Sequence, residues 1–459
     1  MRARVAPRLS AEAGEARHLA KRPWPRVLAI VWLFLCMLIL EGEILGWYRE
    51  VTEAFRLNST PRDFLNLYTG ALLLGQGHGD SLYDLQFQES VQEALLSPQA
   101  AEILRTQVHA RMLPFLSPPF VALLFAPLGR VALPQAYALW LSINAVLLCG
   151  LVALLTVSFS HWSRWERLLA GSAGLSFLPS YFAVWQGQVS LCLALAFALS
   201  WLAFRGRHDG WGGLSLALLL AKPQYAAAAL LYLLWQKRWR ALAGFAVGVT
   251  GLVLLGVLAT GPGGLSSWLR AITQATGLGS YYGIHPELMF TWSGFLTALS
   301  SQPILGAAPS VPFLLWAGLE MCTLLLMAMI WNRQTSEPEA TLGAGFSGLL
   351  IGAILLSPHT YVQDLVLLLP AGYLTWDLMR QQNHTLRSAR WLAVLLGLHV
   401  FVLGLFLLRV AFHTMPYPNL FVVPFLALWL MLLAAASIPP FSARPLVPTA
   451  PSSEAALPP

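Results

Sequence analysis

The sequence predicts an all-α polytopic membrane protein, and three observations support this fold class. Hydrophobic residues make up 57% of the 459 residues and charged residues only 11%, whereas a soluble domain carries about 25% charged residues. Apolar runs of membrane-spanning length recur along the whole chain. The basic residues are few and stand in short clusters between these runs, as they do in the cytoplasmic loops of membrane proteins.

The composition also excludes several classes of protein. The formal net charge of +7 reflects cytoplasmic loop charges rather than a nucleic-acid surface, so no nucleic-acid partner is expected. The four cysteines lie far apart in apolar runs without Cys-x-x-Cys spacing, and they are Cys36, Cys149, Cys192 and Cys322. They are expected to be small packing residues, without a disulfide or a metal.

The N-terminal part is expected to anchor the chain and then form a long external loop. Residues 1–26 are a basic tail, predicted to be disordered and cytoplasmic. The first helix, at about 27–46, is an uncleaved signal anchor because no small-residue cleavage site follows it. Residues 47–114 form the first external loop. The sequence Asp80–Asp84 marks the start of short amphipathic helices there, which are expected to lie on the membrane surface.

Shorter and longer apolar runs follow. After Ser117-Pro118-Pro119, a run of only about fifteen residues to Arg130 favours a re-entrant or interfacial helix. The segment at about 260–310 is expected to be irregular, and residues 441–459 to be a disordered cytoplasmic tail. The remaining runs predict helices at about 135–158, 166–182, 189–204, 211–221, 225–236, 240–259, 312–332, 341–357, 361–379, 391–410 and 418–438.

Residues 27–440 are therefore expected to form a single membrane domain with about 12 crossings. This count follows if all the basic clusters are cytoplasmic. Runs of eleven or twelve residues reach only ~18 Å and cannot cross a ~30 Å hydrocarbon core alone. We therefore expect a water-filled hollow on the outer side of the protein.

This orientation places the polar turns on the outer face, opposite the basic clusters. These turns are Arg62-Asp63, Trp185–Gln188, Lys222–Gln224, Tyr281–Pro286, and Ser357–Tyr361 with Asp364 one turn further on. A catalytic or binding site is expected where they meet.

Asp63 and Lys222 are the leading candidates. Asp63 is one of only six aspartates, and it is either a general base for an acceptor hydroxyl or an ordinary helix N-cap. Lys222 is one of three lysines and the only one within the apolar region. It either binds a lipid-linked phosphate or extends from a helix end to the membrane interface.

Three further residues have two open interpretations each, and a fourth has one. His359 is either functional or a structural hydrogen bonder, and Asp364 is either functional or the counter-charge of Lys222 or His359. Gln188 follows a glycine in a tight turn, as a partner for a sugar hydroxyl or as a helix cap. His285 is read as a loop residue.

Several chemistries are not supported by the sequence. It has no Walker A loop, no His-Glu-x-x-His, no Gly-x-Ser-x-Gly and no Asp-x-Asp pair. Without clustered carboxylates no divalent-metal site is expected. We predict that the protein uses no metal and no cofactor, and that it has no soluble nucleotide-binding domain.

A series of short motifs runs along the chain. The motifs of the first third are Asp63-Phe64 with Tyr68, Ser81–Asp84, Ser117–Phe120 and Ala126–Leu128. Those that follow are Gly187-Gln188, Ala221–Pro223 with Lys237–Trp239, and Ser357–His359. In their order and spacing these motifs resemble glycosyltransferase family 87, and the resemblance covers about residues 27–380.

This resemblance implies a fold and an activity. The fold would be of the GT-C type, and the enzyme would transfer a hexose, with mannose as the expected sugar, from a polyprenyl-phosphate donor in the bilayer. The acceptor would be a glycolipid or polysaccharide on the outer face of a bacterial inner membrane. Asp63 would be the general base of an inverting reaction. Lys222 and His359 would stabilise the leaving phosphate, and Gln188 and Asp364 would help to bind substrate.

Three alternatives remain open. A lipid-linked-sugar flippase or other transporter would also need an outward cavity, and it predicts an inverted repeat that is not evident here. A structural or assembly protein would leave Lys222 without a role. A transferase that uses a diphosphate donor would be expected to have more arginines in a large external loop.

Overall fold

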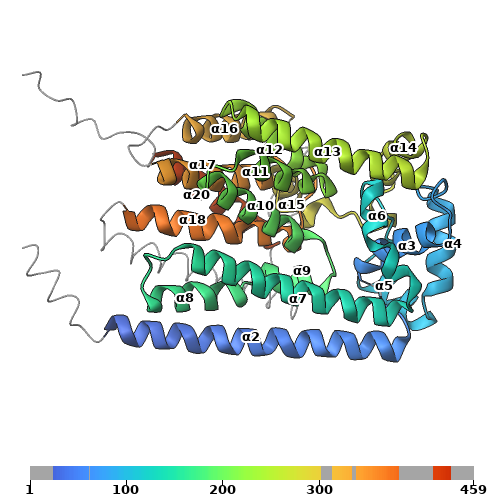
Figure 1. Cartoon of the computed structure of the whole chain (residues 1–459). Coiled ribbons are helices and arrows are strands. Elements are labelled where there is room, and N and C mark those ends of the chain that lie inside the picture. Colours follow the sequence, from blue (N-terminus) through green and yellow to red (C-terminus); the bar gives the residue numbers. More distant parts are fainter. Residues whose placement is uncertain (1–23, 61, 301–312, 333–337, 382–416, 436–459) are drawn as a thin grey trace, which may run out of the picture.

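The computed structural model describes residues 24–60, 62–300, 313–332, 338–381 and 417–435, and every regular element in them is a helix. The predicted tails and the predicted helix at 391–410 lie outside the described residues, apart from the last residues of the N-terminal tail. Figure 1 shows the long helices running side by side, with several short helices gathered at one end of the bundle.

The first long helix, α2 (Trp24–Leu57), extends well beyond the predicted end at residue 46. Its last turns are polar but remain helical, and Arg56 forms an ion pair with Glu53 one turn earlier. The chain then leaves the helix at Asn58, which has a left-handed φ of 49°. The apolar run in the sequence therefore predicts only the part of this helix that suits the bilayer, and the helix itself is longer.

The predicted external loop is mostly helical. It contains α3 (Phe64–Gly75), α4 (Leu85–Leu95) and α5 (Pro98–Thr106). The predicted helix start is confirmed, because the Asp84 side chain accepts hydrogen bonds from the backbone N–H groups of Gln86 and Phe87. The expectation of a loop is wrong for α3, which is an apolar helix buried against its neighbours.

A short helical segment after the two prolines is also confirmed. It consists of α6 (Pro119–Phe125) and the 3-10 helix η1 (Ala126–Arg130). The segment packs closely on α3, since a Cβ atom at Gly129 would lie 2.8 Å from the backbone of Ala71. A glycine is needed for this close approach.

The next predicted helices occur within a few residues of their expected places. They are α7 (Leu133–Ser158), α8 (Arg164–Leu175), α9 (Leu178–Trp185), α10 (Ser190–Arg205), α11 (Asp209–Ala217), η2 (Leu218–Ala221), α12 (Pro223–Trp235) and α13 (Trp239–Thr260). The run predicted as one helix at 166–182 is two helices, α8 and α9, bent by 43°. Pro179 lies in the first turn of α9, where a proline is compatible with a helix start but not with a continuous helix.

The expectation of an irregular segment at about 260–310 is wrong in its described part. It forms α14 (Gly264–Gly277), η3 (Gly279–Tyr282), η4 (Pro286–Leu288) and α15 (Trp292–Ser300). Tertiary contacts hold these helices, as the Trp268 indole shows by donating a hydrogen bond to the Leu116 carbonyl at 2.8 Å. The remaining described elements are α16 (Phe313–Trp331), α17 (Pro338–Leu355), η6 (Val362–Leu367), α18 (Leu368–Gln381) and α20 (Asn419–Ala435).

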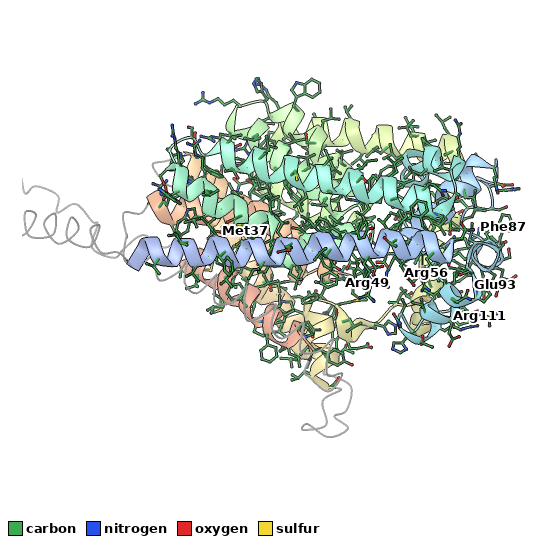
Figure 2. The ribbon with its side chains drawn as sticks, turned by 90° about the horizontal axis from the view of Figure 1, so that it is seen from below. Met37, Arg49, Arg56, Phe87, Glu93 and Arg111 are labelled. Carbon is green, nitrogen blue, oxygen red and sulfur yellow. The ribbon has the colours of Figure 1, made fainter. Side chains whose placement is uncertain are left out.

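Four described helices are long and apolar enough to cross a bilayer, and the bent α8–α9 pair makes a fifth candidate. Their surfaces also suit lipid, because large apolar side chains stand exposed along them, including Met37 at 68% exposure on α2 (Figure 2). The protein is therefore an α-helical membrane protein. Other apolar helices, such as α10 and α17, are shorter than this limit.

Basic residues and ion pairs lie at both ends of the bundle. The helices α3, α4, α5, α6 and α14 gather at the end that α2 reaches with its C-terminus (Figure 1). Arg49 and Arg56 of α2 lie toward this same end, as do Glu93 and Arg111 (Figure 2). Basic residues of the predicted cytoplasmic clusters pair with acids at other helix ends, for example Arg380 with Glu166 and Arg205 with Glu339.

Candidate active site

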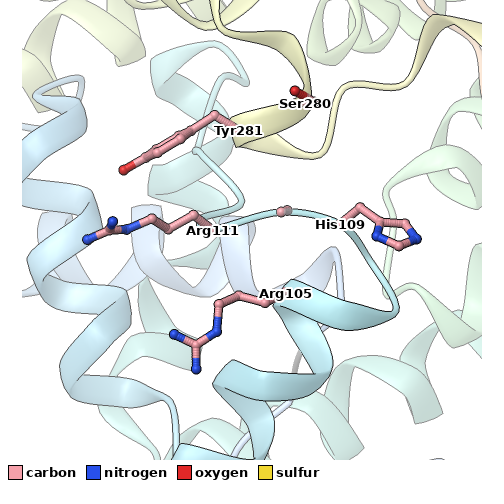
Figure 3. Close-up of a pocket in the computed structure, with 6 residues that line it drawn as sticks. Arg105, His109, Arg111, Ser280 and Tyr281 are labelled. Carbon is pink, nitrogen blue, oxygen red and sulfur yellow. The ribbon is translucent and has the colours of Figure 1, made fainter.

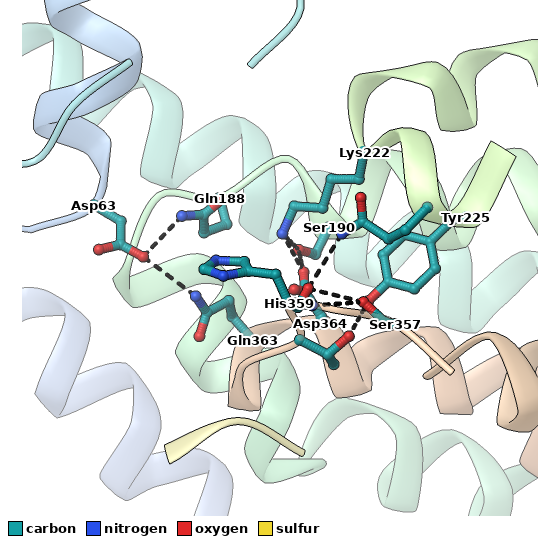
Figure 4. A network of polar contacts seen from close by, with 11 residues as sticks. Asp63, Gln188, Ser190, Lys222, Tyr225, Ser357, His359, Gln363 and Asp364 are labelled. Carbon is teal, nitrogen blue, oxygen red and sulfur yellow. Dashed lines mark hydrogen bonds and ion pairs between the residues drawn. The ribbon is translucent and has the colours of Figure 1, made fainter. Parts of the chain in front are cut away.

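Asp63 stands directly before α3, but its side chain does not cap that helix. The N-cap interpretation of this side chain is therefore wrong. Its Oδ2 accepts hydrogen bonds from the Gln188 amide at 2.8 Å and the Gln363 amide at 3.2 Å (Figure 4). The backbone N–H of Asp63 donates to the Gln186 side-chain oxygen at 3.3 Å. Three glutamines thus surround one aspartate.

A tight turn between α9 and α10 places two of these glutamines. Gly187 has a left-handed φ of 68°, and a Cβ atom there would lie 2.8 Å from the Cβ of Phe64. Glycine is therefore required both by the turn and by its contact with the start of α3. The turn is fixed from α7, because Tyr137 and Trp140 donate hydrogen bonds to the carbonyls of Trp185 and Gly187.

Arg62 stabilises the chain on the other side of Asp63. Its guanidinium forms an ion pair with Glu50 of α2 at 2.9 Å and lies 4.5 Å from the ring centre of Trp185. The planar guanidinium suits both contacts. The segment between α2 and α3 is thus tied to α2 and to the turn that carries Gln188.

Lys222 lies between η2 and α12 in an extended conformation, before Pro223. Its ammonium pairs with the Asp364 carboxylate and lies 3.4 Å from the Ser190 hydroxyl, which also donates to Asp364. Asp364 is only 1% exposed. Of the two interpretations of Asp364, the geometry supports a counter-charge for Lys222. The other interpretation of Lys222, a side chain reaching for the interface, does not fit this pairing.

The segment that carries His359 is fixed by hydrogen bonds to its backbone and to its neighbours. Gln224 donates to the His359 carbonyl at 3.1 Å, and Tyr225 and Thr360 share a hydrogen bond of 2.9 Å. The His359 ring packs edge-on against Tyr361, with 4.8 Å between ring centroids. In Figure 4 this ring lies between Asp63 with its glutamines and Lys222 with Asp364.

The 3-10 helix η6 joins the two groups of contacts. Gln363 and Asp364 are consecutive residues of η6, and both are buried. Gln363 contacts Asp63, whereas Asp364 contacts Lys222. The structure thus brings together all five predicted site residues: Asp63, Gln188, Lys222, His359 and Asp364 (Figure 4).

Burial sets the protonation of Asp63 and His359, which lie in turns outside the candidate spans. It raises the pKa of Asp63 above the usual aspartate range, although the Gln188 hydrogen bond and the Lys222 charge oppose the shift. Burial and the nearby Lys222 charge lower the pKa of His359. His359 is therefore neutral at physiological pH and can exchange hydrogen bonds without adding positive charge.

A shallow pocket of about 360 Å³ lies near this site, where α5 and the turn after α14 meet, and it is lined by Arg105, His109, Ala110, Arg111, Ser280 and Tyr281. Arg105, Arg111 and Tyr281 point in the same direction from separate backbone segments (Figure 3). Glu89 forms an ion pair with Arg111 at 2.7 Å and accepts a hydrogen bond from the Tyr281 hydroxyl at 2.7 Å, so the arginine charge is balanced.

A chain of contacts runs from this pocket to the Asp63 site. The His109 and His285 ring centroids are 6.3 Å apart, and the His285 backbone donates to the Tyr361 hydroxyl at 2.8 Å. Tyr361 in turn packs on His359. His285, read from the sequence as a loop residue, thus lies between the pocket and the site.

The sequence did not single out several residues that complete the site, namely Glu50, Ser190, Tyr225 and Gln363, and it named Gln186 only as part of the polar turn Trp185–Gln188. Gln363 directly precedes Asp364, and Gln186 lies two positions before Gln188, so their places in the sequence gave some indication of a role at the site. Ser190 and Glu50 are ordinary helix residues, and only the fold brings them to the site. Among the described residues, no group of three or more His, Cys, Asp or Glu side chains could hold a metal ion.

The fold and this cluster define a helical membrane protein with a partly buried acid–amide–amine site at one end of its bundle. The model of glycosyltransferase family 87 matches residues 115–358, which is more than half of the chain. The chain belongs to this family and is a membrane glycosyltransferase, as the resemblance predicted. The match includes Gln188 and Lys222 but not Asp63, His359 or Asp364. No curated protein and no solved structure matches the chain.

Proposed function

We propose that this enzyme transfers a hexose, with mannose as the expected sugar, from a polyprenyl-phosphate donor to a hydroxyl group of a glycolipid or polysaccharide. One observation carries this proposal: a carboxylate, Asp63, and an ammonium group, Lys222, flank the His359 ring from two sides (Figure 4). When a hydroxyl group displaces a phosphate, a base beside the attacking oxygen takes its proton, and positive charge beside the departing phosphate stabilises the charge that develops there.

The proposed reaction forms one bond and breaks one. The acceptor hydroxyl gives its proton to the free oxygen of Asp63 as its own oxygen bonds to the anomeric carbon. The bond from that carbon to the phosphate oxygen breaks, and the electron pair leaves with polyprenyl phosphate. Attack from the side opposite the leaving group inverts the anomeric configuration.

Lys222 is suited to the leaving phosphate in spite of its pairing with Asp364. An ammonium group has three N–H donors, and Asp364 and Ser190 contact two of them. The third is left for a phosphate oxygen. Asp364 keeps the ammonium in place before the donor arrives, since an unpaired buried charge would be costly.

The proposal includes a location and an orientation. Arg205 and Arg380, from two of the basic clusters, pair at helix ends, and basic loops are retained in the cytoplasm. Asp63 follows the C-terminal end of α2, whereas the basic tail precedes its N-terminal end. The site would face the outer, periplasmic side of a bacterial inner membrane, in a GT-C fold with about twelve crossings.

The pocket beside η3 supports a carbohydrate acceptor. It offers an aromatic ring from Tyr281, the guanidinium groups of Arg105 and Arg111, and the Ser280 hydroxyl. Arg105 pairs with Glu102 and Arg111 with Glu89, so the lining is not a strong anion site. Hydroxyl-rich neutral sugars fit such a surface, with their apolar faces on the ring and their hydroxyl groups on the donors.

The test is transfer of labelled mannose from polyprenyl-phosphate mannose in membranes that contain equal amounts of each variant. Asp63→Asn keeps the shape of the side chain but cannot take a proton, so transfer should fall by about 10²–10⁴. Asp84→Asn is the matched control, because Asp84 is an exposed helix cap in the same part of the chain. Transfer by Asp63→Asn within about threefold of the parent would refute Asp63 as the base.

A lipid-linked-sugar transporter would give a different result in the same experiment. A transporter moves the donor lipid without forming a glycosidic bond, so the parent protein itself would yield no labelled acceptor. Purified parent protein that forms the labelled product therefore excludes transport alone as its activity.

A further inference from the structure

The short helix η6 holds the two ends of the proposed reaction site at once. Gln363 is 5% exposed and donates to Asp63, while Asp364 is 1% exposed and pairs with Lys222. Successive side chains of a 3-10 helix point about 120° apart, because this helix has three residues per turn. Adjacent residues of η6 can therefore hold different partners at a set separation.

The Asp63 carboxylate is held by one oxygen only. Gln188 approaches from the turn before α10 and Gln363 from η6, and both donate to Oδ2, at 2.8 and 3.2 Å. Within the described part of the chain, Oδ1 accepts no hydrogen bond. The arrangement orients the carboxylate and leaves one oxygen available.

We propose that Gln363 is a positioning residue, whose amide holds Asp63 by Oδ2 so that Oδ1 faces the acceptor hydroxyl, while its neighbour Asp364 keeps Lys222 at the phosphate end. This inference rests on the proposed function, in which Asp63 is the general base. Gln363 itself need not touch either substrate.

The hydrogen bond has an electrostatic consequence that can be measured. An amide N–H stabilises the charged carboxylate more than the neutral acid, so it favours the ionised base. Removing this donor from a buried carboxylate raises its pKa further. The loss of activity at acid pH must then begin at a higher pH.

The experiment measures kcat against pH for the purified, full-length protein at saturating polyprenyl-phosphate mannose. The acceptor is the glycan fraction extracted from native membranes. Gln363→Met keeps the length of the side chain and removes the donor. The acid limb of this profile is the fall of kcat as the pH is lowered. We expect this limb to lie about one pH unit higher in Gln363→Met, which corresponds to the lower end of the free-energy range for a hydrogen bond to a charged group.

A second variant and a control sharpen the test. Gln363→Glu places a second carboxylate beside Asp63, so its acid limb should lie higher still. Gln363→Glu also preserves the size and polarity of the side chain, so it can be used for the same measurement if Gln363→Met is unstable. Gln186→Met removes a hydrogen bond to the backbone of Asp63 but not to its carboxylate. Its kcat is free to fall, but its acid limb should stay at the parental pH.

The outcomes separate the two levels of the argument. If folded Gln363 variants keep the parental acid limb while Asp63→Asn is inactive, the positioning role is overturned and the base assignment stands. If Asp63→Asn retains transfer, Asp63 is not the general base, and the proposed function is refuted at that point. Movement of the limb in the order parent, methionine, glutamate supports the positioning role, because general loss of structure would not produce that order.

Discussion

The pairing of Lys222 with Asp364 makes a sharp prediction about donor binding. Lys222→Met removes the ammonium and keeps an unbranched apolar side chain. If the ammonium binds the donor phosphate, its loss removes a charge-assisted hydrogen bond worth about 1.5–3 kcal/mol. The dissociation constant for polyprenyl-phosphate mannose should then rise by roughly tenfold to more than a hundredfold.

The structure shows that this single substitution has a second effect. It leaves the Asp364 carboxylate, which is 1% exposed, without its partner. Breaking a buried ion pair in this way costs about 3–5 kcal/mol of stability. Poor binding by Lys222→Met could therefore result from a weakened fold rather than from a lost phosphate contact.

The double variant Lys222→Met with Asp364→Asn separates these effects. It removes both charges, so its thermal midpoint in detergent should recover most of what Lys222→Met loses, since no unpaired charge remains. Donor affinity, measured by equilibrium binding of labelled polyprenyl-phosphate mannose, should stay as weak as in Lys222→Met. Parental donor affinity in the stable double variant would refute a role for Lys222 in phosphate binding.

Three further predictions concern pH, orientation and the acceptor. Because Asp63 must be ionised to act and burial raises its pKa, kcat should be full above that pKa and fall as the pH drops through it. This limb should lie above the usual aspartate range and be absent from the residual rate of Asp63→Asn. In a background without native cysteines, a cysteine beside Asp63 or His359 should react with an impermeant thiol reagent from outside, and one beside Arg207 should not. Labelling of the Arg207 position from the same side as the Asp63 and His359 positions would contradict the orientation. Tyr281→Ala should raise KM for the glycan acceptor by about tenfold, because one aromatic contact is lost, while KM for the donor should not change. An unchanged KM for the acceptor would show that the pocket does not bind it.

The membrane class and most helices could be predicted from the sequence because they depend on local composition. Apolar runs such as 135–158 and 240–259 match α7 and α13 closely, since a segment that is apolar on all sides must be buried in lipid or protein. The Asp84 cap was predictable for the same reason, because a cap bonds to residues two and three positions away. The family was also predictable, because its motifs keep their order along the chain.

Local composition failed where tertiary contacts decide the structure. Residues 64–75 and 264–277 were expected to be loop or irregular segments, yet they form α3 and α14. Neither has the length of a span, and α14 is amphipathic rather than uniformly apolar. Their stability comes from burial against distant segments, such as the contact of α3 with η1, which no local window contains.

The candidate site shows the same division. The sequence by itself pointed to Asp63, Gln188, Lys222, His359 and Asp364, because polar residues are rare in such an apolar chain and need a reason to be there. Only the tertiary structure decided which of them meet. Gln363 reaches Asp63 across 300 residues of sequence, and Asp364 reaches Lys222 across 142. Composition identifies a buried polar group that needs a partner, but only the packing of helices determines which partner it has.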